Sequence, residues 1–403
     1  MLRTHLITAI FLALVFSFSP AAGQNDTIKE EKKGYVFTDE IRLAATPVKN
    51  QSRSGTCWSF GTNSLIESEL LRMDKGEFSL SEMFVVRHTY AAKADRYVRL
   101  HGHMNFSAGG ALPDAFWVLK NFGMVPEEAY DGKVIGEENH VHGEMDAVLK
   151  AYVDAIIKNP NRKLTPVWKD GFIGLLETYL GSYPDEFTYK GRKYTPKSFA
   201  DMLGVKADDF VQLSSFTHHP FYQPFIVEVP DNWNWDKAYN LPLEELMEVI
   251  DGALANGYTV VWASDISERG FSHRNGVAIV PETDPEILDG MERGRWEQLT
   301  QKEKDEMLYS FKEPVQEKKI TQEERQLGFD NFTTTDDHAM HIIGTARDQN
   351  GGKYYIVKNS WGTDNNPYGG YLYASEAFVQ YKTISIMVNK NAMSRKMRGK
   401  LGL

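Results

Sequence analysis

The chain of 403 residues contains a single cysteine, Cys57. One cysteine cannot form an intramolecular disulfide, so burial of apolar side chains must stabilise the fold, which a chain of this length can achieve. Hydrophobic residues make up 42% and charged residues 25% of the chain, which is typical of a soluble globular protein with about two or three domains. The lone thiol is either a small buried apolar group or a reactive one.

The charge balance argues against nucleic acids as partners. Forty-five Lys and Arg residues face 55 Asp and Glu residues, which gives a formal net charge of −10. Such a chain has no overall positive field to attract phosphates or an anionic membrane surface. We therefore expect no nucleic-acid partner.

The N-terminus is typical of a secretory signal peptide. Arg3 precedes an apolar run from Leu6 to Phe18, and small residues follow at 21–23. Because the run is short for a membrane span, we expect cleavage after Gly23 and no membrane anchor. The protein would be periplasmic or extracellular, with a cytoplasmic location as the alternative. Disulfides are available outside the cytoplasm, and a chain that keeps one free thiol there favours chemistry at that thiol.

A helix is predicted to begin at Cys57. Residues 46–56 are rich in turn formers, and apolar residues then recur at helical spacing to about Met73, with Gly76 ending the pattern. In the first turn of a helix, free N–H groups and the helix dipole favour an anion. The position therefore predicts a thiol that is activated as a nucleophile.

His338 is the predicted partner of this thiol. It lies at the start of an apolar strand, and a second strand at 354–358 ends at Asn359. A glycine-containing turn at 349–352 would make the two strands antiparallel neighbours and bring His338 and Asn359 to the same end of the sheet. The Asn359 carbonyl would then accept from one ring nitrogen and direct the other toward Cys57.

Two further residues near His338 bear on this arrangement. Trp361 would shield the hydrogen bond between His338 and Asn359 from water. His341 is an alternative base, but it lies three residues along the strand and so points to the opposite face.

The remaining histidines give no metal signature. Three pairs lie in polar, loop-like sequence without a cysteine ligand or a helical His-Glu-x-x-His pattern: His101 and His103, His140 and His142, and His218 and His219. His273 has no supporting context. We therefore predict no metal site and no cofactor.

Taken together, these residues resemble the papain-like cysteine peptidases. Five motifs occur in the order of that family: Gln51-x5-Cys57-Trp58-Ser59-Phe60, Leu80-Ser81-Glu82, Gly109-Gly110, Asp337-His338-Ala339 and Asn359-Ser360-Trp361-Gly362. The resemblance implies that Cys57 is the nucleophile, His338 the general acid and base, and Asn359 the residue that orients the imidazole.

The same resemblance implies an oxyanion hole and a substrate-binding surface. The Gln51 side-chain amide and the Cys57 backbone N–H would stabilise the oxyanion. Gly109, Gly110 and Trp361 would contact a peptide substrate bound as an extended strand.

Two departures from the papain signature narrow the resemblance. Ser54 stands where the signature has a second cysteine, and His338 follows Cys57 by 281 residues instead of about 130–150. An expanded chain without disulfides resembles the bleomycin hydrolase and aminopeptidase C subfamily. This implies peptide substrates, removal of N-terminal residues and a homohexamer. An endopeptidase of the same fold is the alternative, and a non-catalytic exported peptide-binding protein is a second one.

The C-terminal tail does not fit the subfamily. There, a C-terminal arm returns to the cleft and its carboxylate holds the α-amino group of the substrate. Residues 391–403 are instead basic and unlike the apolar tail of the subfamily.

We expect an α+β protein with a papain-like fold, in which a helical half meets an antiparallel, β-barrel-like half and large helical insertions are added. The expected segments are a signal peptide (1–23), a flexible leader (24–34), the helical half with the nucleophile (35–130), a helical insertion (131–224), the start of the β half (225–281), a charged helical insertion (282–330), the β half with His338 and Asn359 (331–390) and the tail (391–403).

Overall fold

The computed structural model describes residues 34–283, 296 and 298–403. The predicted signal peptide and residues 24–33 of the predicted leader lie outside the described residues. Within the described residues, every helix is too short or too polar to cross a membrane.

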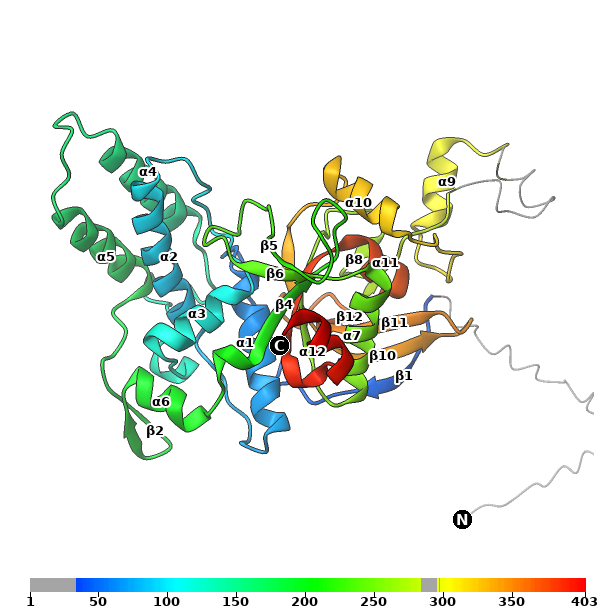
Figure 1. Ribbon diagram of the computed structural model, residues 1–403, viewed down its shortest axis with the longest axis horizontal. Coiled ribbons are helices and arrows are strands. Elements are labelled where there is room, and N and C mark those ends of the chain that lie inside the picture. The colour runs from blue at the N-terminus through cyan, green and yellow to red at the C-terminus, as the bar shows by residue number, and fades with distance from the viewer. Residues whose placement is uncertain (1–33, 284–295, 297) are drawn as a thin grey trace, which may run out of the picture. The chain divides into compact units, whose positions relative to one another are not determined.

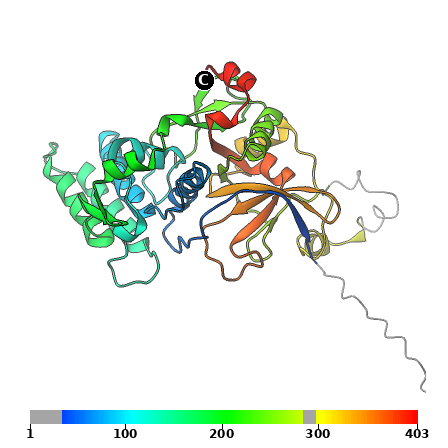
Figure 2. The same ribbon diagram turned by 90° about the horizontal axis from the view of Figure 1, so that it is seen from below.

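Helix α1 (Cys57–Arg72) lies between a group of helices and a large sheet (Figure 1 and Figure 2). It contacts α2 and α3 on one side and strands β7 and β10 on the other, so all its residues from Trp58 to Leu70 are buried. The helical group comprises α2 (Glu82–Arg99), α3 (Pro113–Phe122), α4 (Gly143–Ile157), α5 (Val167–Leu180) and α6 (Pro196–Leu203).

Local sequence signals explain where these helices begin and end. The Ser81 side chain caps α2 by accepting from the Phe84 N–H at 3.0 Å. Helix α3 starts at Pro113, which suits the first turn, and stops at Gly123, whose φ of 92° favours glycine. These signals fix the ends of α2 and α3, the two helices that contact α1.

The sheet contains eleven strands in the order β5-β6-β4-β13-β7-β10-β11-β12-β9-β8, with β1 paired to β10. Their bounds are β1 (Phe37–Arg42), β4 (Phe210–Ser214), β5 (Pro224–Ile226), β6 (Lys237–Asn240), β7 (Val260–Ser264), β8 (Phe271–Ser272), β9 (Val277–Ala278), β10 (His338–Asp348), β11 (Lys353–Lys358), β12 (Tyr371–Ser375) and β13 (Thr383–Asn389).

Strand β10 is the branch point of the sheet. Its first half, from His338 to Ile342, pairs with β7, while Gly344 to Asp348 pair with β1. Most pairings are antiparallel, and the end strands β5 and β8 do not pair with each other within the described part of the chain. The α+β class is confirmed, but the expected barrel-like half is an open, branched sheet.

Helices α7 (Leu243–Ala255), α11 (Glu376–Lys382) and α12 (Arg395–Leu401) cover the far face of the sheet, which is the face turned away from α1, and share one apolar core with it. A separate core fills the space between the near face, on which α1 packs, and the helical group. Other described elements are the β2–β3 hairpin (Phe187–Tyr189, Arg192–Tyr194), α9 (Gln301–Leu308) and α10 (Gln322–Asp330).

The segment 131–224 differs from the expected helical insertion. It is mainly helical only as far as Leu203, and Phe210–Ser214 then forms β4, which pairs with β13 inside the sheet. All five residues of β4 are buried, including the polar Gln212 and Ser214, and the alternation of apolar and polar residues from Val211 to Ser214 covers only four positions.

Candidate functional site

The sheet brings His338 and Asn359 together. His338 is the first residue of β10 and Asn359 follows the last residue of its antiparallel neighbour β11. The His338 Nε2 donates to Asn359 Oδ1 at 2.8 Å, which leaves Nδ1 as the nitrogen available to a thiol. The Trp361 ring lies over the imidazole, with centroids 4.8 Å apart. The predicted antiparallel pairing of the two strands is therefore found.

Helix α1 places Cys57 opposite this pair. Cys57 is the first residue of α1, and the backbone N–H groups of Ala339 and Trp58 lie close enough to its sulfur to lower its pKa. The sulfur therefore lies beside the residue that follows His338. Cys57 and His338 line one cavity of about 220 Å³.

Burial opposes the ionisation of both reactive groups. Burial, together with the charges of Asp336 and Asp231, raises the pKa of Cys57 to about 12. Burial also lowers the pKa of His338 to about 4, which outweighs the hydrogen bond to Asn359. Desolvation disfavours the charged form of both groups, in opposition to the effect of the helix start on the thiol.

Gln51 has the orientation that an oxyanion hole requires. Its Oε1 accepts from Ser360 Oγ at 2.6 Å, so its Nε2 is left to donate elsewhere. The Gln51 N–H donates to the Ser360 carbonyl at 2.8 Å, and Asn50 forms a β-bridge with Trp361. The loop that carries Gln51 is thus tied to the loop that follows Asn359.

The two glycines lie in the cavity wall across from His338. Gly109 and Gly110 both line the cavity, and Trp58 supports their loop by donating from Nε1 to the Ala108 carbonyl at 3.1 Å. A Cβ at Gly110 would lie 2.7 Å from the Trp58 ring. Trp361, predicted as a shield and as a substrate contact, covers His338 and is absent from the described residues that line this cavity.

His273 is a member of the site that sequence reasoning missed. Asn359 Nδ2 donates to His273 Nδ1 at 3.3 Å, and the His273 ring lies 5.0 Å from that of Trp361. To accept this bond His273 must be unprotonated at Nδ1, and burial lowers its pKa accordingly. The bond orients the Asn359 amide so that its oxygen faces His338. No local pattern identifies His273, because it lies 86 residues before Asn359.

We expect His273→Ala to lower kcat about 2- to 10-fold with little change in KM, because one hydrogen bond that orients Asn359 is lost. His273→Asn keeps a side-chain acceptor and should restore most of the activity. Steady-state kinetics of both variants check this expectation. A rise in KM at constant kcat would contradict a role in positioning Asn359.

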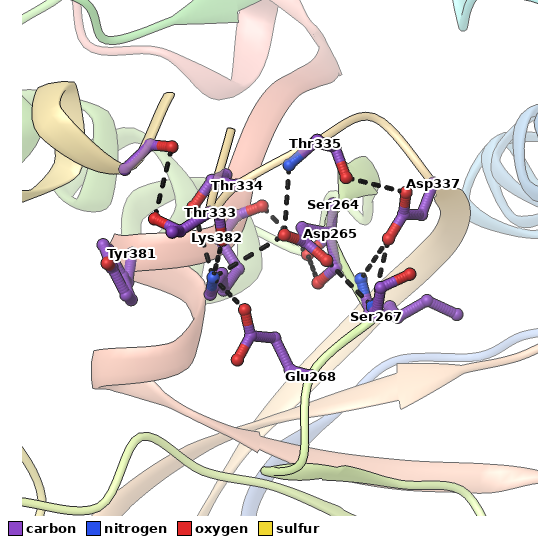
Figure 3. A network of polar contacts seen from close by, with 12 residues as sticks. Ser264, Asp265, Ser267, Glu268, Thr333, Thr334, Thr335, Asp337, Tyr381 and Lys382 are labelled. Atoms are coloured by element: carbon purple, nitrogen blue, oxygen red, sulfur yellow. Dashed lines mark hydrogen bonds and ion pairs between the residues drawn. The ribbon is translucent and has the colours of Figure 1, made fainter. Parts of the chain in front are cut away.

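A polar network, buried at Asp265 and Lys382 and exposed at Asp337, supports the segment that leads to His338 (Figure 3). Asp337 accepts from the Ser267 N–H at 3.0 Å and from Thr335 Oγ1 at 2.9 Å. Asp265 accepts from the Thr335 N–H at 3.0 Å, and Lys382 donates to the Thr333 carbonyl at 2.5 Å. These contacts attach residues 333–337 to β7 and α11, which fixes the start of β10.

His341 lies away from the cavity. Its Nδ1 is 2.9 Å from Ser64 Oγ in the contact between β10 and α1, and burial lowers its pKa well below the usual value. As predicted, it lies on the face of β10 opposite to that of a residue three positions earlier.

One histidine pair meets a carboxylate. His218 and His219 each bond to Glu228, at 2.7 and 3.0 Å, and the three side chains offer ligand atoms within 4.8 Å of one another. This is the arrangement in the described chain that could hold a metal ion. It lies outside the cavity of Cys57 and needs no ion, because the three groups satisfy one another by hydrogen bonds.

The tail residues 391–403 lie on the far side of the sheet. Lys400 pairs with Glu245 of α7 at 2.6 Å, and Met397 and Leu401 are buried in the core below α7. None of the described residues 391–403 lines the cavity of Cys57. This tail does not place a carboxylate beside the nucleophile.

Comparison with known families identifies two matching regions. Residues 38–162 match the papain family cysteine proteases, and residues 287–402 match a peptidase C1-like family. The first region contains Cys57 and the second contains His338 and Asn359.

Several relatives match almost the whole chain. Aminopeptidase E of Lactobacillus helveticus is 24% identical over 94% of this chain and 88% of its own, and aminopeptidase C of Streptococcus thermophilus is 22% identical over 91% and 84%. Human cathepsin L2 is 33% identical but over only 26% of each chain. The crystal structure of PepW from Lactobacillus rhamnosis HN001 (DR20) covers 91% of this chain and 84% of its own with a TM-score of 0.66 at 17% identity. Together with the family match, this likeness confirms the predicted papain-like fold.

Proposed function

Because this chain belongs to the papain-like cysteine peptidases and resembles the aminopeptidase C enzymes along its length, we propose that it removes N-terminal residues from peptides. The observation that carries this proposal is the extent of the matches. The relatives that span both halves and the insertions are named aminopeptidases, whereas the match to cathepsin L2 covers about a quarter of the chain.

The proposed reaction is acyl transfer to Cys57. The thiol attacks the carbonyl carbon of the first peptide bond while His338 Nδ1 takes the thiol proton, for which the neutral imidazole is already in its basic form. Asn359 holds Nε2 and so keeps Nδ1 directed at the sulfur. The negative charge that develops on the carbonyl oxygen receives hydrogen bonds from Gln51 Nε2 and the Cys57 N–H.

The second half of the reaction restores the free enzyme. The His338 imidazolium gives its proton to the leaving amine, and the C–N bond breaks to leave a thioester on Cys57. His338 then takes a proton from water, the hydroxide oxygen bonds to the thioester carbon, and the thiolate leaves and regains the proton. The charges of the site are therefore present only during each transfer, which agrees with the raised pKa of Cys57 and the lowered pKa of His338.

A pair of matched substrates tests the aminopeptidase proposal. We expect the mature protein, under reducing conditions, to hydrolyse alanine aminomethylcoumarin amide at least about 100-fold faster than its N-acetylated twin. A charged group held in a specific ion pair supports discrimination of this order. Equal rates on the two would instead assign an endopeptidase.

The proposal extends to location and assembly. Export through the signal peptide at residues 1–23 would place the enzyme in the periplasm or outside the cell. A homohexamer is the assembly that resemblance to the subfamily implies.

A further inference from the structure

We propose that Asp231 and Asp336, here called the acidic pair, bind the free α-ammonium group of the substrate and thereby make this site select for N-terminal residues. This inference rests on the proposed aminopeptidase function and names the residues that would enforce it. Both carboxylates line the cavity that contains Cys57, His338, Gly109 and Gly110.

Asp231 lies over the first of the two glycines. It belongs to the loop between β5 and β6, and its Oδ2 lies so close to Gly109 that a Cβ there would overlap the carboxylate. An extended peptide that continued along Gly109 would meet this carboxylate. Asp231 therefore closes the part of the cavity in which an endopeptidase would hold further N-terminal residues of its substrate.

The two oxygens of Asp231 have different surroundings. Oδ1 accepts from Asn105 Nδ2 at 2.9 Å and from Ser107 Oγ at 3.3 Å, which holds the side chain in place. Oδ2, the oxygen over Gly109, receives no hydrogen bond from the described residues and faces the cavity. A fixed carboxylate with one unused oxygen is suited to accept from an ammonium group.

Asp336, two residues before His338, supplies the second carboxylate that lines the cavity. It is partly buried, and no hydrogen bond reaches it from the part of the chain that the structure describes. Burial, together with the charge of Asp231, raises the pKa of Asp336 to about 7. An unpaired carboxylate in a cavity wall costs folding energy, and a bound cation removes that cost.

Lys93, whose charge acts on Asp231, does not take the place of a bound ammonium group. Lys93 is buried beneath the glycine loop, where its Nζ donates to the carbonyls of Ser107, at 2.7 Å, and Gly109. Its charge acts on Asp231 but is not among those that act on Asp336. The acidic pair thus keeps an excess of negative charge inside the cavity.

The position of the pair suits the α-nitrogen of a first residue. That nitrogen is two covalent bonds from the carbonyl carbon that Cys57 attacks, so a group that holds it must lie near the sulfur. Both carboxylates are near enough to Cys57 to raise the pKa of its thiol. The tail is remote from the cavity, so the acidic pair provides a carboxylate that the tail does not.

Asn variants of the acidic pair test this assignment with the matched substrates described above. In D336N and D231N we expect kcat/KM for the free substrate to fall about 10- to 100-fold, mainly through KM, because a charge-assisted hydrogen bond is lost. Hydrolysis of the N-acetylated twin should stay level or rise, since its amide carries no charge. D208N, at an exposed carboxylate paired with Lys120, is the control that should leave both rates unchanged.

The outcomes of these measurements distinguish a failure of the aminopeptidase proposal from a failure of the acidic-pair assignment. If wild-type enzyme cleaves both substrates equally, the aminopeptidase proposal fails and this inference fails with it. If wild-type enzyme prefers the free amine and both Asn variants keep that preference, only the acidic pair is wrong. If the variants lose cleavage of an N-acetylated substrate with a lysine before the cleaved bond instead, the pair binds a side-chain cation. D336N removes no hydrogen bond, so it reports on charge even if D231N does not fold.

Discussion

Replacement of Cys57 by alanine is expected to lower kcat/KM for the free alanine substrate by at least about 10⁴-fold. The thiol is the only cysteine sulfur of the chain, and it lies at the start of α1 beside the backbone of Ala339. Without it no thioester can form, and the remaining groups can only polarise the carbonyl. Hydrolysis by wild-type protein and by C57A under reducing conditions measures the effect.

The C57A comparison also distinguishes a cysteine peptidase from a non-catalytic peptide-binding protein. Labelling of Cys57 by an epoxide thiol inhibitor in folded wild-type protein should parallel the loss of activity, because both need the same sulfur and the same imidazole. C57A should still unfold cooperatively, since the substitution removes one sulfur atom from a cavity wall. Activity that survives in C57A would contradict the nucleophile. An inactive wild-type protein that takes no label would favour the peptide-binding alternative.

Replacement of Lys382 by methionine is expected to lower the free energy of unfolding by about 3–5 kcal/mol. The side chain of Lys382 is 2% exposed and lies 3.6 Å from Asp265, whose side chain is 4% exposed. Its Nζ also contacts Glu268 and the carbonyl of Thr333 (Figure 3). Methionine fills much of the same space but leaves Asp265 without its cation, and an unpaired buried carboxylate is costly.

Urea unfolding of K382M against wild-type protein measures this loss. Lys302 pairs with Glu306 on the surface of α9, with side chains 85% and 67% exposed, so K302M is a control that should leave the midpoint unchanged. We also expect K382M to lower activity in its folded form, because the Thr333 contact fixes the segment before His338. Equal unfolding midpoints for K382M and K302M would show that the network does not stabilise the fold.

Several parts of the fold were predictable because their signals are local. The helix at Cys57 follows from apolar spacing after a turn-rich segment, and the pairing of β10 with β11 follows from two apolar strands around a glycine turn. The proximity of His338 and Asn359 depends only on that hairpin. Strand β4 was missed because its alternation of apolar and polar residues covers only four positions and its polar residues are buried like the apolar ones.

Other features of the site arise only when distant segments meet. His273 reaches Asn359 across 86 residues, and Asp231 reaches Gly109 from the loop after β5. The pKa of Cys57 likewise depends on the whole fold, because a helix start acts locally while burial and two carboxylates come from other segments.

The sequence by itself determined the local elements and the order of the reactive residues, since periodicity, capping and turn chemistry act over a few neighbouring residues. The charges that face Cys57, the side chain that orients Asn359 and the position of the tail follow from the packing of distant segments. Desolvation and electrostatic contacts depend on distance in space, and neighbours in space are not neighbours along the chain.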